Sequence, residues 1–133
     1  MTALRILPAV VPIVAAALAI AASAQAEDST LADPIQIFTD NCAACHQPDG
    51  KGIEGAFPAL AGDKFVIGPA SACIKVVLDG RAGMPSFRSL SDAEIAAALT
   101  HVRTSWGNRA TPVAADQVAK LRGNSTPVKN SGH

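Results

Sequence analysis

The stretch Cys42-Ala43-Ala44-Cys45-His46 decides how this sequence folds and what it holds. Two cysteines separated by two residues and followed directly by a histidine form the C-x-x-C-H signature of covalent haem attachment. The two thiols reach the vinyl groups on one side of the porphyrin, and the adjacent imidazole then lies beneath the iron as its proximal ligand. The motif therefore predicts that Cys42 and Cys45 bind haem covalently and that His46 ligates the iron.

Other uses of a C-x-x-C pair require features that this sequence does not show. A thioredoxin-like redox pair follows a strand in a β-α-β arrangement, and no strand pattern precedes Cys42. A zinc site needs a second pair of Cys or His ligands, and the sequence has no other such pair. Instead, an apolar stripe at helical spacing runs directly into the motif, formed by Ile35, Phe38, Cys42 and Cys45. This helical face is expected to pack beside the haem.

Met84 is the only methionine beyond the first residue of the chain. One helix and two loops separate it from His46, enough chain to wrap a porphyrin and reach its opposite face. Gly83 and Pro85 flank it in a compact polar loop, which is a poor place for a core methionine. The sequence therefore predicts Met84 as the second axial ligand of the iron, with a core or surface methionine as the alternative.

Three other residues with ligand or thiol chemistry are expected to have other roles. His101 lies off the apolar stripe of its helix, so we expect it at the surface or rim, and His133 is the last residue of the chain. Cys73 is left over from the C-x-x-C pair and is expected to be a small buried hydrophobe. An intermolecular disulfide through Cys73 is the alternative in an oxidising compartment.

The rest of the pattern predicts an all-α domain with three main helices and a short extra helix. The first begins at Asp33-Pro34, because proline at the first helical position loses no needed donor. The third begins with a capping box of Ser91 and Glu94. Loops are expected over 47–62 and 81–90, and a second helix between Pro69 and Gly80. The third helix is expected to end at Gly107 and to carry an apolar stripe of Ile95, Leu99, Val102 and Trp106. The short extra helix is expected over 113–122.

The two ends of the chain are predicted to lie outside this domain. Residues 1–26 resemble a secretory signal peptide, with a positive Arg5, a long uncharged stretch and a small-x-small cleavage pattern at 24–26. An uncleaved membrane anchor is the alternative, which interrupting prolines disfavour. Residues 27–122 are the expected domain, exported to the periplasm. Residues 123–133 have almost nothing to bury and are expected to be a disordered tail.

Charge and aromatic content narrow the function classes. Without Arg5, the chain carries one more acidic than basic residue, so it is not a basic nucleic-acid binder. Phenylalanine and tryptophan together make up only 4% of the chain, and tyrosine is absent. A domain of this size with so few large side chains has a thin core, so we expect a bound group to fill its centre.

Several motifs in order resemble class I cytochromes c. C-A-A-C-H is followed by Q-P-D-G-K-G, F-P-A-L-A-G, G-M-P-S-F and L-S-D-A-E-I-A, over residues 33–108. The resemblance implies an all-α fold wrapped around one covalent haem c, with its first and last main helices packed together. It also implies that the carbonyl of Pro58 accepts a hydrogen bond from the proximal histidine, where ordinary loop rigidity is the alternative. The segment V-R-T-S-W-G-N is similar to cytochrome subunits of periplasmic dehydrogenases, which often have tyrosine where this chain has His101.

The resemblance implies an electron-transfer protein and not an enzyme in itself. We expect a one-electron carrier between a periplasmic dehydrogenase and a downstream cytochrome or terminal oxidase, with no nucleic-acid partner and no membrane span in the mature form. A permanent subunit of a dehydrogenase complex is one alternative. A peroxidase-like haem enzyme is another, and it would need an open sixth position on the iron.

Overall fold

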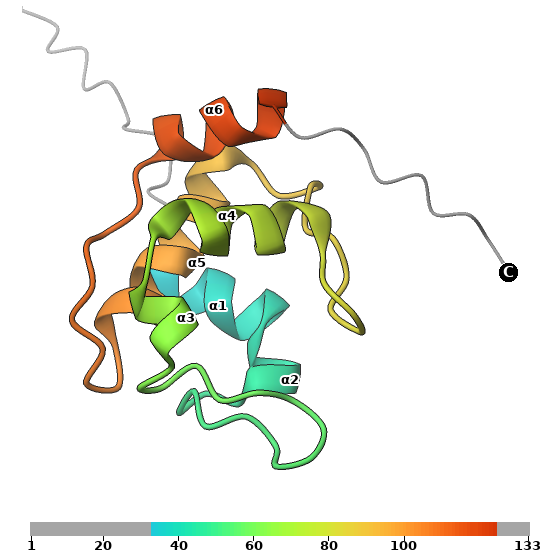
Figure 1. The fold of residues 1–133 in the computed structure, drawn as a ribbon, viewed down its shortest axis with the longest axis vertical. Helices are drawn as coiled ribbons and strands as arrows, with labels where there is room; N and C mark the ends of the chain where they lie inside the picture. The colour runs from blue at the N-terminus through green and yellow to red at the C-terminus, as the bar shows by residue number, and fades with distance from the viewer. Residues whose placement is uncertain (1–32, 125–133) are drawn as a thin grey trace, which may run out of the picture.

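The computed structural model describes residues 33–124, which form six helices and no sheet (Figure 1). The helices are α1 (Pro34–Asn41), α2 (Ala43–His46), α3 (Lys64–Ile67), α4 (Ala70–Asp79), α5 (Asp92–Thr104) and α6 (Ala115–Asn124). In this part of the chain, β pairing is limited to two isolated bridges, Ile53 with Phe57 and Arg81 with Met84. The helix α1 packs against α5, while α6 packs against α4 and α5. The predicted all-α class is confirmed, with more helices than the three main ones expected.

Local capping explains where α1 and α5, the two helices that pack against each other, begin. The side chain of Asp33 accepts a hydrogen bond of 2.9 Å from the backbone N–H of Ile35, and Pro34 occupies the first turn of α1. At α5, the hydroxyl of Ser91 accepts from the N–H of Glu94 at 3.2 Å, and the Glu94 carboxylate accepts from the N–H of Ser91 at 2.8 Å. Both predicted helix starts are therefore confirmed.

The expected stripe on the first helix is interrupted and unevenly buried. The helix breaks at Cys42, whose φ of −124° separates α1 from α2, although Cys42 N–H still donates to Phe38 C=O at 2.8 Å. Ile35 is 61% exposed and contributes little to the packing between helices, whereas Phe38 is 1% exposed. A single buried aromatic therefore anchors α1.

Two separate clusters of apolar side chains form the core. The first lies between α4, α5 and α6 and contains Cys73, Ile74, Leu78, Ile95, Ala96, Leu99, Val113 and Val118. The second joins α1, α2, α3 and α5 and contains Phe38, Ala43, Val66 and Val102, with Trp106 packed against it. The predicted packing of the first main helix on the third is confirmed, because α1 contacts α5 and the ring of Phe38 lies 5.2 Å from that of His101 on α5.

The end of α5 and the C-terminal segment shift some predicted boundaries. The helix ends at Thr104, before Gly107, and Trp106 follows it with a left-handed φ of 53°. The helix α6 reaches Asn124, so the predicted tail at 123–133 is wrong for its first two residues. The rest of that tail and the predicted signal peptide at 1–26 lie outside the described residues. Within residues 33–124, none of the helices combines the length and apolar character of a membrane span.

Two buried polar side chains secure the segment that contains α3. The guanidinium of Arg103, 2% exposed, donates to the carbonyl oxygens of Val66 at 2.6 Å, Gly68 at 2.9 Å and Thr111 at 3.0 Å. Asn108 is 4% exposed and donates to the carbonyl oxygens of Leu60 and Val102, while its side-chain oxygen accepts from the N–H of Gly62. Buried polar groups that are satisfied in this way fix one path for the chain.

His101 makes the α1–α5 contact sensitive to pH. Its ring lies 5.2 Å from the rings of both Phe38 and Trp106, and its partial burial agrees with the expected position at the surface or rim. Burial lowers the pKa of His101 below its usual 6.5, with Asp33 opposing the shift. The unfolded chain then binds more protons between the two pKa values, so the free energy of unfolding falls as the pH decreases through 6.5.

We therefore expect acidification from about pH 7 to pH 5 to destabilise the protein, and His101→Phe to flatten that dependence. Denaturant unfolding at several pH values measures it. An unchanged slope in the variant would assign the pH dependence to other groups.

Candidate haem site

The imidazole of His46 is held in a fixed orientation by the backbone. His46 is 9% exposed, and its Nδ1 lies 2.9 Å from the carbonyl oxygen of Pro58. Because a carbonyl oxygen only accepts, Nδ1 carries the proton and donates it. The other ring nitrogen, Nε2, is then left with a lone pair, which is the form in which neutral imidazole binds a metal. The contact expected from Pro58 is thus present in the structure.

Gly52 allows the backbone to come close to this hydrogen bond. Its φ of +65° lies in the left-handed region, and its N–H donates to the carbonyl oxygen of His46 at 2.9 Å. A Cβ at this position would lie 2.3 Å from the carbonyl oxygen of Phe57 and 2.6 Å from that of Pro58. Only glycine therefore fits against the carbonyl that orients His46.

We expect Gly52→Ala to push the Pro58 carbonyl away from His46 and to change the reduction potential of the protein. Loss of a hydrogen bond that orients an axial histidine also makes the ring a weaker donor. Potentiometric titration measures the shift. Gly55→Ala is the matched control, because Gly55 has a φ of +76° in the same loop but nothing within 4 Å of its Cβ position. Equal shifts in the two variants would indicate general loop strain instead.

Cys42 is the N-cap residue of α2 and Cys45 is the third residue of the helix. Both side chains are partly buried, and neither forms a disulfide. Burial, together with the nearby Cys45, raises the pKa of the Cys42 thiol to about 11. Redox-active C-x-x-C pairs have a lowered pKa at the attacking cysteine, so this environment is unlike a thioredoxin-type site.

Met84 sits at the end of a tight turn rather than on a helix. The N–H of Arg81 donates to the carbonyl oxygen of Met84 at 3.0 Å, and the N–H of Met84 donates to the carbonyl oxygen of Arg81 at 2.9 Å. Gly80 precedes this turn with a φ of +77°, and its Cβ position lies 2.7 Å from the Met84 carbonyl oxygen. The side chain is partly buried and belongs to neither core cluster. The turn therefore presents a thioether from a defined backbone position.

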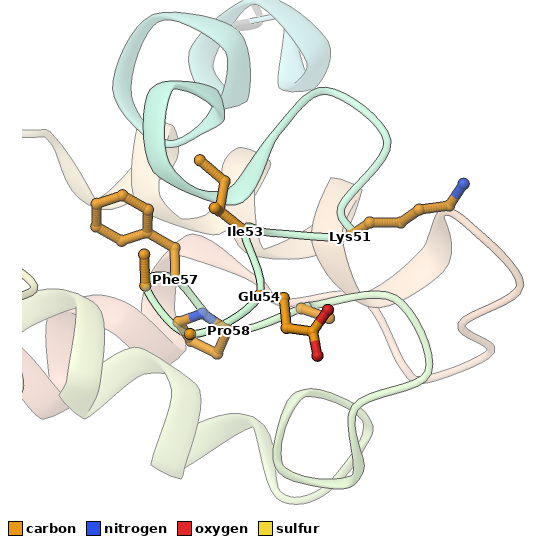
Figure 2. A pocket seen from close by; sticks show the side chains of 8 residues that line it. Lys51, Ile53, Glu54, Phe57 and Pro58 are labelled. Carbon is orange, nitrogen blue, oxygen red and sulfur yellow. The ribbon is translucent and has the colours of Figure 1, made fainter.

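Large apolar side chains are exposed on the loop that leads to Pro58 and on α3. Ile53 and Phe57 are 43% and 40% exposed on the loop that leads to Pro58, and Figure 2 shows both projecting from the same side of that loop. Phe65 and Ile67 of α3 are 41% and 44% exposed. A cavity of about 420 Å³ is lined by residues within 51–59 of this one loop, including Ile53, Phe57 and Pro58, and by none of the predicted haem or iron ligands. Exposed large apolar side chains are available for contact with a bound group or a partner.

The donor groups of these residues are of the kinds that bind haem and its iron. Two thiols, an imidazole with an available lone pair and a thioether form the set that binds haem c and its iron. The flat, apolar face of a porphyrin would suit contact with the exposed side chains of Ile53 and Phe57. We therefore infer that the described residues can hold this group.

The remaining residues with thiol or imidazole chemistry have other contacts in the structure. Cys73 is 5% exposed in the first core cluster, as predicted, with its Sγ 3.6 Å from the Val66 carbonyl oxygen. Burial raises the pKa of its thiol, against the opposing pull of Arg103. His101 contacts the rings of Phe38 and Trp106. His133 lies outside the described residues.

Comparisons with known proteins identify the family of the chain. A family model described as cytochrome C oxidase, cbb3-type, subunit III matches residues 29–102, more than half of the chain. Cytochrome c-552 of Thermus thermophilus is 40% identical over 112 residues, covering 68% of this chain and 85% of that protein. The cytochrome c subunit of alcohol dehydrogenase (quinone) from Gluconobacter oxydans (strain 621H) is 36% identical over 111 residues.

The two kinds of relative differ in how much of them this chain covers. The match to the Gluconobacter subunit takes in 73% of this chain but only 23% of that subunit. The gluconate 2-dehydrogenase cytochrome c subunit of Pantoea cypripedii, 31% identical, is covered over 25% of its length. The chain thus spans about a quarter of those dehydrogenase subunits and most of cytochrome c-552. It belongs to the cytochrome c family, whose members bind haem c covalently and carry electrons.

Proposed function

We propose that this chain is a single-haem carrier of the periplasm that takes electrons one at a time from a dehydrogenase. It passes them to a downstream cytochrome or a terminal oxidase. The observation that supports this most strongly is the hydrogen bond from His46 to Pro58, because it leaves Nε2 of the ring available as an iron ligand. When bound, haem c supplies a one-electron centre that cycles between Fe(III) and Fe(II).

The protein residues set how this centre is held and tuned. We assign Cys42 and Cys45 to the two thioether bonds, His46 and Met84 to the axial positions, and Pro58 to orienting the His46 ring. A soft thioether favours the reduced iron, so the His/Met pair raises the reduction potential. The exposed apolar side chains of Ile53 and Phe57 would be available to shield a bound haem from water.

A visible absorption spectrum of the exported protein, oxidised and then reduced, tests the ligand set. We expect sharp c-type bands on reduction and, in the oxidised protein, the weak long-wavelength band of Met–Fe(III). Met84→Ala should abolish that weak band while the covalent haem is retained. A high-spin spectrum of the unsubstituted protein, or one without the band, would remove Met84 as a ligand. Ready binding of carbon monoxide to the reduced protein would then favour a haem enzyme.

A fixed subunit of a dehydrogenase is the second candidate, favoured by the similarity to dehydrogenase cytochrome subunits. The coverage of cytochrome c-552 over 85% of its length favours the independent carrier. Purification from the native membrane and periplasmic fractions separates them. A carrier is recovered free of large chains after a high-salt wash, whereas a fixed subunit remains with a dehydrogenase.

Export rests on the leader at residues 1–26. We propose cleavage after Ala26, so that the mature protein begins at Glu27. Intact mass measurement of the haem-loaded periplasmic protein tests this. A mass that retains the leader would indicate the membrane-anchored form.

A further inference from the structure

The loop that carries Met84 is fixed to the helix before it. The hydroxyl of Ser86 donates to the carbonyl oxygen of Leu78 at 2.6 Å, and the N–H of Phe87 donates to that of Val77 at 2.9 Å. Both bonds tie the segment that follows Met84 to the last turns of α4. The tip of the loop, Ala82 and Gly83, is exposed. The position of Met84 therefore depends on how firmly the two arms of the loop are held.

Arg122 of α6 holds the far end of the same loop. Its Nη1 donates to the carbonyl oxygen of Arg88 at 2.8 Å, and its Nη2 donates to that of Leu90 at 2.7 Å. Its Nε donates at 2.7 Å to the carboxylate of Asp92, at the start of α5. All three nitrogens of one planar guanidinium are used, a geometry that lysine does not reproduce. Arg122 thus joins α6, the end of the Met84 loop and α5.

The environment of Arg122 strengthens these bonds. Its side chain is 26% exposed and that of Asp92 is 32% exposed, so water screens the pair only in part. The helix α6 is itself anchored, because Val118 is 0% exposed in the first core cluster. In Figure 1 the gold stretch that leads from the loop into α5 passes beneath α6. The guanidinium therefore acts from a rigid base and not from a flexible tail.

We propose that Arg122 is a positioning residue that holds the Met84 loop closed and so resists displacement of Met84 from the iron. This inference rests on the proposed ligation by Met84. Loops open locally with a free energy set by the contacts that anchor them. A competing ligand binds only the open form, so its apparent affinity rises in proportion to the open fraction. Removing the carbonyl bonds of Arg122 raises that fraction.

Binding of added imidazole to the oxidised, haem-loaded protein is the test. We expect Arg122→Gln to bind imidazole about tenfold more tightly than the unsubstituted protein, a change of about 1.4 kcal/mol. The long-wavelength Met–Fe(III) band should be present without imidazole in both proteins. Arg122→Lys keeps the charge without the planar fork, so it should bind with intermediate affinity. If Arg122→Gln fails to fold, Arg122→Lys provides the test in its place.

Two controls separate positioning from charge and from stability. Lys120→Gln makes the same charge change at an exposed position of α6, and Val102→Ala weakens the second core cluster away from the loop. Both should bind imidazole as the unsubstituted protein does. If Arg122→Gln bound imidazole no more tightly than the unsubstituted protein, the role of Arg122 would be overturned and the Met84 assignment would stand. The same conclusion would follow if either control variant bound imidazole as tightly as Arg122→Gln. A missing Met band in the unsubstituted protein would overturn the Met84 assignment, and this inference with it.

Discussion

Replacing Phe38 with alanine is expected to lower the free energy of unfolding by about 3–5 kcal/mol, the range for deleting a buried aromatic side chain. Phe38 is 1% exposed and is the one buried residue of α1. Its ring lies 5.2 Å from those of His101 and Trp106, so the substitution leaves a cavity where α1 meets α5. Denaturant unfolding of the haem-loaded protein measures the change.

Ile35→Ala is the matched control for Phe38→Ala. Both residues lie on α1, but Ile35 is 61% exposed, so its truncation should change the free energy of unfolding by no more than about 0.5 kcal/mol. Comparable losses in the two variants would mean that the whole expected stripe is buried in the folded protein. A small loss for Phe38 alone would mean that α1 does not depend on its contact with α5.

Helix starts could be predicted from the sequence because their causes are local. Asp33 with Pro34, and Ser91 with Glu94, place the needed donors and acceptors within a few residues of one another. The contact between His46 and Pro58 was reached only through family resemblance. Nothing in the spacing of these two residues indicates a hydrogen bond, because the intervening loop sets it.

The break at Cys42 and the exposure of Ile35 could not be predicted from periodicity. A stripe shows which residues share a helical face, but not where a partner helix stops covering that face. The short α3 was missed because four residues carry no periodic signal. Asp63 accepts from the N–H of Val66 and Gly68 follows the helix, so a capping signal was present but not used.

The burial of Arg103 could not be predicted from the sequence. Charged residues are rarely fully buried, and no carboxylate stands near it in sequence. Its partners are the carbonyl oxygens of Val66, Gly68 and Thr111, which tertiary folding brings together. The aromatic contacts of His101 could not be predicted for the same reason, since the rings it contacts lie on α1 and beyond the end of α5.

Gly80→Ala is expected to displace the Met84 turn and to remove most of the long-wavelength Met–Fe(III) band. A Cβ at Gly80 would lie 2.7 Å from the carbonyl oxygen of Met84 and 3.0 Å from the backbone N of Ser86. Both neighbours are backbone atoms, so no side-chain rotation relieves the contact. The φ of +77° adds a strain of about 1–3 kcal/mol for a residue other than glycine.

The contact and the strain can be separated with Gly107→Ala. Gly107 has a φ of +85° and nothing within 4 Å of its Cβ position, so alanine there meets the backbone strain alone. We expect Gly107→Ala to lower the free energy of unfolding by about 1–3 kcal/mol and to keep the Met band. Gly80→Ala should lower it further and lose the band, because the new methyl group pushes against the backbone that presents the thioether. If Gly80→Ala retained the full band, the turn would have to shift without moving Met84, and the close approach of Gly80 would not be what fixes the ligand.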